Sequence, residues 1–138
     1  MVRVGKATVA DVAVTCPELH DAGTTVGELT ELFLDDHVHL ALLVDGDQLV
    51  AAVEREDLRP GLDPDLPARL VGGLDGRIVQ PDAPAGKMLA WMRTECRRRL
   101  AVVDEEGRLL GLLCLKASGR GFCSDEDVAR RKLAPTAA

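Results

Sequence analysis

The chain has 138 residues and a net charge of −6, and 46% of its residues are hydrophobic. This hydrophobic share is typical of a folded domain and argues against a disordered chain. An acidic chain lacks the basic face that displaces counterions from phosphates, so we expect no nucleic-acid partner. No apolar run approaches the roughly eighteen residues of a membrane span, and the amino end lacks the apolar core of a signal peptide. We therefore expect a cytoplasmic protein with no membrane partner.

An internal repeat organises the sequence. Residues 26–45 align with residues 85–104 without a gap at an offset of 59. One extra residue in the turn that follows moves the offset to 60, so that Leu49 meets Leu109. The chain is thus two copies of one structural unit.

The first copy opens with a short apolar segment closed by a proline, "VAVTCP" at residues 12–17, which we expect to be a strand. An amphipathic helix follows, because apolar side chains recur at helical spacing; they are Val26, Leu29 and Phe33, with His37 next in the series. The runs "LALLV" and "LVAAV", at 40–44 and 49–53, predict two strands joined by a tight turn at Gly46. Each copy therefore predicts the order strand, helix, strand, strand, short helix.

Residues 59–76 are rich in proline and glycine and predict a joint, with "LPARLV" as a short helical piece. The second copy repeats the pattern with the segment "RIVQP", a helix, and a hairpin whose turn contains Gly107; the helix stripe is Ala85, Met88, Met92 and Cys96. A last helix is predicted after Ser124, which with Asp127 matches a capping box. The expected domains are 1–60, a joint at 61–76, 77–119, and a helical tail at 120–138.

The cysteines and histidines do not predict a metal site. Cysteines 16, 96, 114 and 123 contain no C-x-x-C pair, so we interpret them as small buried hydrophobic residues. Among the three histidines, 20, 37 and 39, only the pair in "HVH" has a spacing that zinc sites use. We expect His37 to be a packed or edge residue, and no metal.

The repeat resembles a tandem pair of cystathionine-β-synthase (CBS) domains, the arrangement called a Bateman module. The resemblance covers roughly residues 9–119, and its carriers are the hairpins "LLVDGDQLVAAVEREDL" and "LAVVDEEGRLLGLL", each behind a helix. It implies an α/β (α+β) fold in which two units pack about a pseudo-twofold axis. It also implies clefts that hold adenine nucleotides, and a sensory role toward another protein.

The family's ligand signature is a Thr or Ser at the end of the last strand, two further residues, and then an Asp that accepts from the ribose hydroxyls. In the first copy Glu54 replaces the hydroxyl residue, while Asp57 stands where the ribose carboxylate is expected. In the second copy Cys114 and Ala117 stand at these positions, so the signature is lost. The resemblance places the adenine against the segment before the first helix, at Val14, Thr15 and Cys16.

Glu54 alters the choice of ligand at this candidate site. Two unit charges about 5 Å apart repel by roughly 3 kcal/mol at an effective dielectric near 20, so a phosphate beside Glu54 is disfavoured. Arg55, His39 or Arg98 would offset this repulsion only if aimed inward; the alternative for the Arg97–Arg99 run is a solvated helix end. AMP, ADP and ATP are therefore less favoured than adenosine or the cationic S-adenosylmethionine.

Two interpretations of Asp57 remain open at this stage. An acid three residues after a strand end also matches a capping box, in which it supports only the start of a helix. The protein is then either a ligand-sensing module or a degenerate, ligand-free adaptor. Both act on a separate partner protein, and no catalytic constellation favours an enzyme.

We also expect a homodimer. Leu32 and its counterpart Trp91 lie on the same flank of their helices, beside the apolar stripe, and an exposed Trp is costly. Intrachain packing is the alternative for this flank. The arginine-over-lysine bias and the absence of Asn and Tyr are typical of a GC-rich bacterial genome.

Overall fold

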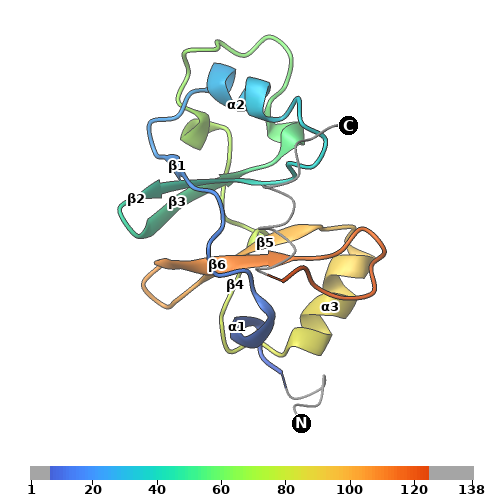
Figure 1. Ribbon diagram of the computed structural model, residues 1–138. Coiled ribbons are helices and arrows are strands. Elements are labelled where there is room, and N and C mark those ends of the chain that lie inside the picture. The colour runs from blue at the N-terminus through green and yellow to red at the C-terminus, as the bar shows by residue number, and fades with distance from the viewer. Residues whose placement is uncertain (1–6, 125–138) are drawn as a thin grey trace. The chain divides into compact units, whose positions relative to one another are not determined.

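The computed structural model describes residues 7–124 and forms two three-stranded sheets, each with helices on one face (Figure 1). The sheet orders are β1-β2-β3 and β4-β5-β6. The elements in chain order are α1 (Val9–Val12), β1 (His20–Asp21), α2 (Val26–Leu32), β2 (Ala41–Asp45), β3 (Gln48–Val53), the 3₁₀ turns η2 (Arg55–Asp57) and η3 (Ala68–Leu70), β4 (Ile78–Val79), α3 (Ala85–Thr94), β5 (Arg99–Val103) and β6 (Leu109–Cys114). The mixed helix and strand architecture expected from the repeat is confirmed.

Both predicted hairpins form where the apolar runs placed them. β2 pairs antiparallel with β3, and the turn residue Gly46 has φ +63°; Gly107, in the turn between β5 and β6, has φ +81°. Such φ values favour glycine because it has no Cβ. Leu42 and Leu43 are both fully buried, so β2 is covered on both faces at these positions.

The two long helices also begin where the periodicity placed them, but they end earlier. Phe33 is the C-cap of α2, and Asp35 accepts the backbone N–H of His37 at 2.9 Å, a turn that ends the helical path. In the second copy α3 ends at Thr94, and Cys96 has φ +56°. His37 and Cys96 are therefore exposed and do not continue the apolar stripes.

The expectation of four buried cysteines is wrong for two of them. Cys16 and Cys96 are exposed, whereas Cys114 and Cys123 are buried. Cys16 and Cys96 occupy loop and helix-end positions, where no sheet or helix face covers the side chain.

The predicted strand at residues 12–17 is not formed. The preceding residues instead make the short helix α1, because Thr8 and Asp11 form a capping box in which Thr8 N donates to Asp11 Oδ2 at 2.8 Å. Of the apolar segment, Val14 alone joins a bridge, with Leu112. The first strand in the structure is β1, at His20–Asp21.

Residues 66–73, predicted as part of a joint, are a second copy of residues 7–14. Ala68 N donates to Thr24 O and Val9 N donates to Ala83 O, both at 2.9 Å. Ala68 lies 59 residues after Val9 and Ala83 lies 59 residues after Thr24, so the two hydrogen bonds correspond at the offset of the repeat. The short helical piece predicted in "LPARLV" is confirmed as η3. Each leading segment thus packs on the body of the other sequence copy.

Each compact unit of the chain therefore combines the leading segment of one sequence copy with the body of the other. Within the described residues, unit 1 comprises 7–17, 79–102 and 110–124, and unit 2 comprises 18–78 and 103–109. The sequence-based boundaries at 60 and 76 follow the linear repeat, whereas the compact units combine one leading segment with the other body. Packing about a pseudo-twofold axis stays a prediction.

The chain after β6 differs from the expected short helix. Within the described residues it turns back at Gly119, which has φ +73°, and Leu115 bridges antiparallel to Phe122. The helix predicted after Ser124 lies outside the described residues. Across residues 7–124, no helix has both the length and the apolar character needed to cross a membrane.

Candidate functional site

Glu54 and Asp57 lie at the two ends of the short turn η2, which follows β3; Glu54 precedes η2 and Asp57 is its last residue. Glu54 is the N-cap of η2, and its backbone N–H donates to Asp57 Oδ2 at 2.8 Å. The capping role considered for Asp57 is therefore confirmed. In this role Asp57 Oδ2 accepts one hydrogen bond, and the carboxylate points toward the start of the turn.

Arg77, which the sequence analysis did not identify, completes the cluster. Its Nη1 donates to Asp57 Oδ2 at 2.5 Å and its Nη2 to Asp57 Oδ1 at 3.0 Å. Nη2 also lies 3.0 Å from Glu54 Oε1, and Nη1 donates to Ala52 O at 2.7 Å. All three charged side chains are largely buried, with 16–20% of their surface exposed.

The two terminal nitrogens of Arg77 carry all the contacts that hold the cluster together. Each terminal nitrogen of Arg77 has two contacts, and a bidentate pair with a carboxylate is the strongest form of this interaction. The hydrogen bonds that Arg77 donates to Asp57 raise the pKa of Arg77 above its ordinary value despite the opposing effect of burial. The cluster of Glu54, Asp57 and Arg77, here called the Arg77 cluster, therefore carries a net charge of −1.

The backbone of residues 72–77 positions Arg77. Ala52 and Gly73 exchange hydrogen bonds of 3.0 and 3.1 Å, which fix this segment along β3. A Cβ on Gly72 would lie 2.8 Å from Ala52 O, so the close approach requires glycine. The chain then turns at Gly76, with φ +73°, and presents Arg77 to the end of β3. The only sequence signal for this contact is the repeat of residues 7–14 at 66–73, which extends the second copy back through the joint.

Arg55 has a different role from the one considered for it. Its guanidinium donates to the backbone oxygens of Phe33 and Val38, the latter at 2.9 Å, and lies 5.1 Å from the Phe33 ring centre. A cation at these carbonyls stabilises the C-terminal end of α2. Arg55 is thus committed to the end of the helix.

The remaining residues predicted to contact a ligand are divided between the two units. Val14, Thr15 and Cys16 belong to unit 1, where Val14 exchanges backbone hydrogen bonds of 2.8 and 2.9 Å with Leu112. Arg98 also belongs to unit 1 and donates from Nε to Leu115 O at 3.1 Å. His39, which is half-buried, belongs to unit 2 with the Arg77 cluster.

Unit 1 has no acid at the corresponding position. Cys114 is buried beside Val14 and Cys123, and Ala117 is exposed. Within residues 7–124 no group of three His, Cys, Asp or Glu side chains is placed to hold a metal ion.

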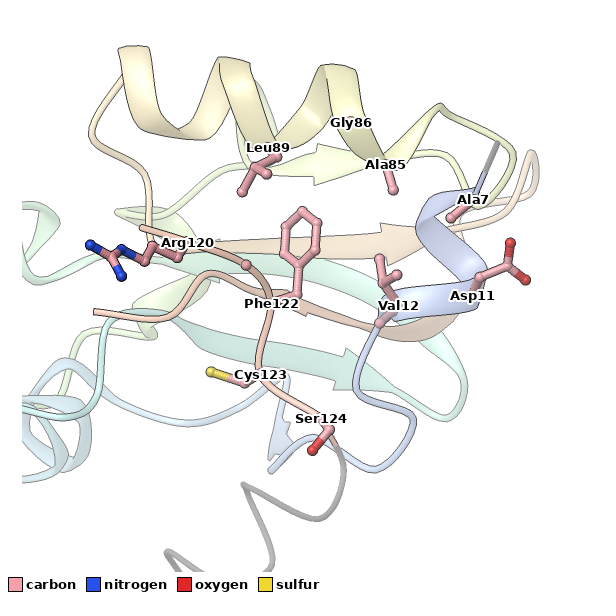
Figure 2. A pocket seen from close by; sticks show the side chains of 12 residues that line it. Ala7, Asp11, Val12, Ala85, Gly86, Leu89, Arg120, Phe122, Cys123 and Ser124 are labelled. Carbon is pink, nitrogen blue, oxygen red and sulfur yellow. The ribbon is translucent and has the colours of Figure 1, made fainter. Parts of the chain in front are cut away.

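Unit 1 instead contains a cavity of about 770 Å³ between α1, the start of α3 and residues 120–124 (Figure 2). Phe122 and Leu89 lie in the middle of its lining, while Asp11 and Arg120 stand at opposite sides of it. The volume is within the usual range for a small-molecule site. The lining residues are Ala7, Asp11, Val12, Ala13, Ala85, Gly86, Leu89, Arg120, Gly121, Phe122, Cys123 and Ser124.

Comparison with known sequences gives no relative. No protein-family model matches the chain. No curated protein matches it either.

Comparison with solved structures gives close matches in fold. The CBS-domain pair of protein MJ0100, in complex with 5-methylthioadenosine and S-adenosyl-L-methionine, matches with a TM-score of 0.61 and 16% identity, over 91% of this chain and 95% of that one. The CBS-domain protein PAE2072 from Pyrobaculum aerophilum, complexed with AMP, matches with a TM-score of 0.61 and 23% identity, over 78% and 86%.

The cytosolic domain of the Mg²⁺ channel MgtE, in complex with ATP, matches with a TM-score of 0.63 and 20% identity. The match covers 91% of this chain but 49% of the MgtE chain, so this protein spans about half of that structure's length. At such identities the likeness concerns the fold.

Proposed function

Because this chain has the fold of a CBS-domain pair, we propose that it is a non-catalytic regulatory module that acts by contacting a separate protein, with Asp57 committed to the structure of unit 2. The observation that carries this proposal is the bidentate pair between Arg77 and Asp57. It occupies the carboxylate that the family resemblance assigns to a ribose.

The energies favour the internal pair over a ribose. A hydrogen bond to a charged group contributes about 1.5–3 kcal/mol, and removing one partner of a buried ion pair costs about 3–5 kcal/mol. The Arg77 cluster is partly exposed, so the lower part of that range applies. A ribose must therefore offset the loss of Arg77 before it gains anything from Asp57.

The absence of a ribose carboxylate in unit 1 supports the same proposal. Ala117 has no acceptor in its side chain, and the buried Cys114 replaces the hydroxyl residue of the signature. Neither copy of the signature then offers an unoccupied acid to an adenosine.

A second candidate function is the sensing of an adenosine-containing ligand. Asp57 stands at the signature position, and the three solved structures above contain AMP, ATP or S-adenosylmethionine with methylthioadenosine. Binding on Asp57 requires Arg77 to leave. Glu54 pairs with Arg77, which reduces the repulsion of a phosphate, but the cluster keeps a net charge of −1, so AMP and ATP stay less favoured than S-adenosylmethionine.

A thermal-shift panel of AMP, ATP, S-adenosylmethionine and methylthioadenosine distinguishes the proposed ligand-free module from the sensor of an adenosine-containing ligand. A ligand at a hundred times its Kd stabilises a protein by about 2.7 kcal/mol. We expect no shift with any of the four. A shift that appears in the wild-type protein and disappears in Asp57→Asn would overturn the proposal in favour of the second candidate.

We further propose that the module is a homodimer that pairs through α3. Trp91 has 37% of its surface exposed and is the one large hydrophobic side chain on α3 that is exposed. Leu32, its counterpart on α2, is half-buried against the core of unit 2, so Trp91 is the stronger candidate for the interface.

A further inference from the structure

Cys114 and Cys123 lie directly opposite each other on neighbouring extended segments of unit 1. Leu115 bridges antiparallel to Phe122, and one step along the same register Cys123 N donates to Cys114 O at 2.6 Å. Residues paired in this way project their side chains from the same face of the sheet. The two thiols are therefore neighbours, although nine positions separate them in the sequence.

The spacing of such a pair suits a disulfide. Opposite residues of the hydrogen-bonded kind, such as this pair, have Cα atoms about 5.5 Å apart and Cβ atoms near the upper end of about 4.5–5.5 Å. Disulfides have Cα separations of about 4.4–6.8 Å and Cβ separations of about 3.5–4.5 Å. Both side chains are buried in one cluster with Val14, so a shift of about 1 Å within the cluster is sufficient.

The two cysteines differ in access. Cys123 is among the residues that line the cavity of about 770 Å³, between Phe122 and Ser124 in sequence (Figure 2). Cys114 is not among the lining residues. Both thiols are buried in one cluster with Val14, Cys114 being 1% and Cys123 4% exposed. A small oxidant that enters the cavity therefore reaches Cys123 first.

We propose that Cys114 and Cys123 form a site of oxidative modification whose co-substrate is a hydroperoxide. The Cys123 sulfur attacks hydrogen peroxide, its S–O bond forms as the O–O bond breaks, and water leaves with the thiol proton. The Cys114 sulfur then attacks the Cys123 sulfenic acid, so that the S–S bond forms, the S–O bond breaks and a second water leaves. The thiols lose two electrons and the peroxide gains them.

The disulfide ties the cavity wall to β6. Residues 122 and 123 line the cavity and are otherwise held to β6 by the bridge of Leu115 with Phe122 and the hydrogen bond between the cysteines. A covalent link closes this loop in the unfolded chain as well, which raises the unfolding temperature. Oxidation thus fixes the position of Phe122 in the cavity.

The test uses the full chain with the exposed thiols removed, as Cys16→Ser with Cys96→Ser. After hydrogen peroxide and digestion with trypsin without reductant, we expect the peptides LLGLLCLK (109–116) and GFCSDEDVAR (121–130) to be joined. The unfolding temperature should rise and return to its starting value with dithiothreitol. Recovery of both peptides with separately alkylated or separately over-oxidised cysteines would overturn the proposal.

A matched variant tests the order of the steps. In Cys114→Ala on the same background, we expect peroxide to leave Cys123 as a sulfenic acid that dimedone labels, with no rise in unfolding temperature. In Cys123→Ala, we expect little labelling of Cys114, because it does not reach the cavity. Equal labelling in the two variants would overturn the assignment of Cys123 as the residue oxidised first.

Discussion

Arg77 holds both oxygens of Asp57 with its two terminal nitrogens, at 2.5 and 3.0 Å, across 20 residues of sequence. The pair joins the end of β3 to the residue just before β4, and it also takes in Glu54 at 3.0 Å. Asp57, the acid that the sequence resemblance assigns to a ribose, is therefore part of the internal structure of unit 2. The proposal of a regulatory module that works through protein contacts depends on this pair.

Two glycine substitutions in unit 1 should have opposite effects on stability. The first, at Gly111, tests the packing of residues 7–17 against β6. A Cβ on Gly111 would lie 2.6 Å from Val14 O, where residues 7–17 meet β6, and we expect Gly111→Ala to lower the free energy of unfolding by about 1–3 kcal/mol. Gly86, in α3, has nothing within 4 Å of its added Cβ, so Gly86→Ala should stabilise by about 0.5–1 kcal/mol. Urea unfolding measures both. A wild-type midpoint for Gly111→Ala would contradict the contact with residue 14.

Acid should weaken the turn between β5 and β6. Burial raises the pKa of Asp104, but hydrogen bonds from the backbone and side chain of Arg108 and the backbone of Glu106 outweigh it, so the pKa lies below its ordinary value. A carboxylate with a lowered folded pKa contributes stability that is present above the unfolded pKa and is lost as the pH falls through the folded pKa.

Asp104→Asn should therefore lower the unfolding temperature at pH 7 and leave it nearly unchanged at pH 2, where the wild-type carboxylate is itself protonated. Asp36→Asn, at an exposed position, is the control. Thermal unfolding followed by circular dichroism at several pH values gives the comparison. An equal loss at pH 7 and pH 2 would show that the effect is not one of charge.

The proposed dimer predicts a change in mass on removal of one side chain. Trp91→Ala should shift the species measured by light scattering from twice 14.8 kDa toward 14.8 kDa. Leu110→Ala, which removes another exposed apolar side chain in unit 1, should leave the dimer intact. A dimer that persists in Trp91→Ala, or a wild-type monomer, would remove α3 from the interface.

Much of the fold follows from the sequence because the apolar pattern repeats. The helical spacing of Val26 and Leu29 predicted α2. The apolar runs on either side of Gly46 and Gly107 predicted both hairpins. The pattern failed at residues 12–17, where an apolar run suggested a strand although the capping pair Thr8 and Asp11 starts a helix just before it.

The candidate site was less accessible to sequence reasoning. Asp57 was found because it matches a motif, but Arg77 reaches it through a loop whose path depends on Gly72 and Gly76. Nothing in the spacing of residues 57 and 77 indicates that they meet. For the same reason Arg55, adjacent to the motif, was considered as a ligand contact although it binds the end of α2.

A double-mutant cycle on Arg77 and Asp57 tests the central claim most directly. Urea unfolding of Arg77→Gln, Asp57→Asn, the double variant and the wild type gives the interaction energy of the pair, and Arg108→Gln provides a control from a more exposed ion pair. The pair predicts a coupling of about 1–3 kcal/mol, with each single variant nearly as unstable as the double. Additive losses, with a coupling below about 0.3 kcal/mol, would contradict the claim that Arg77 occupies Asp57.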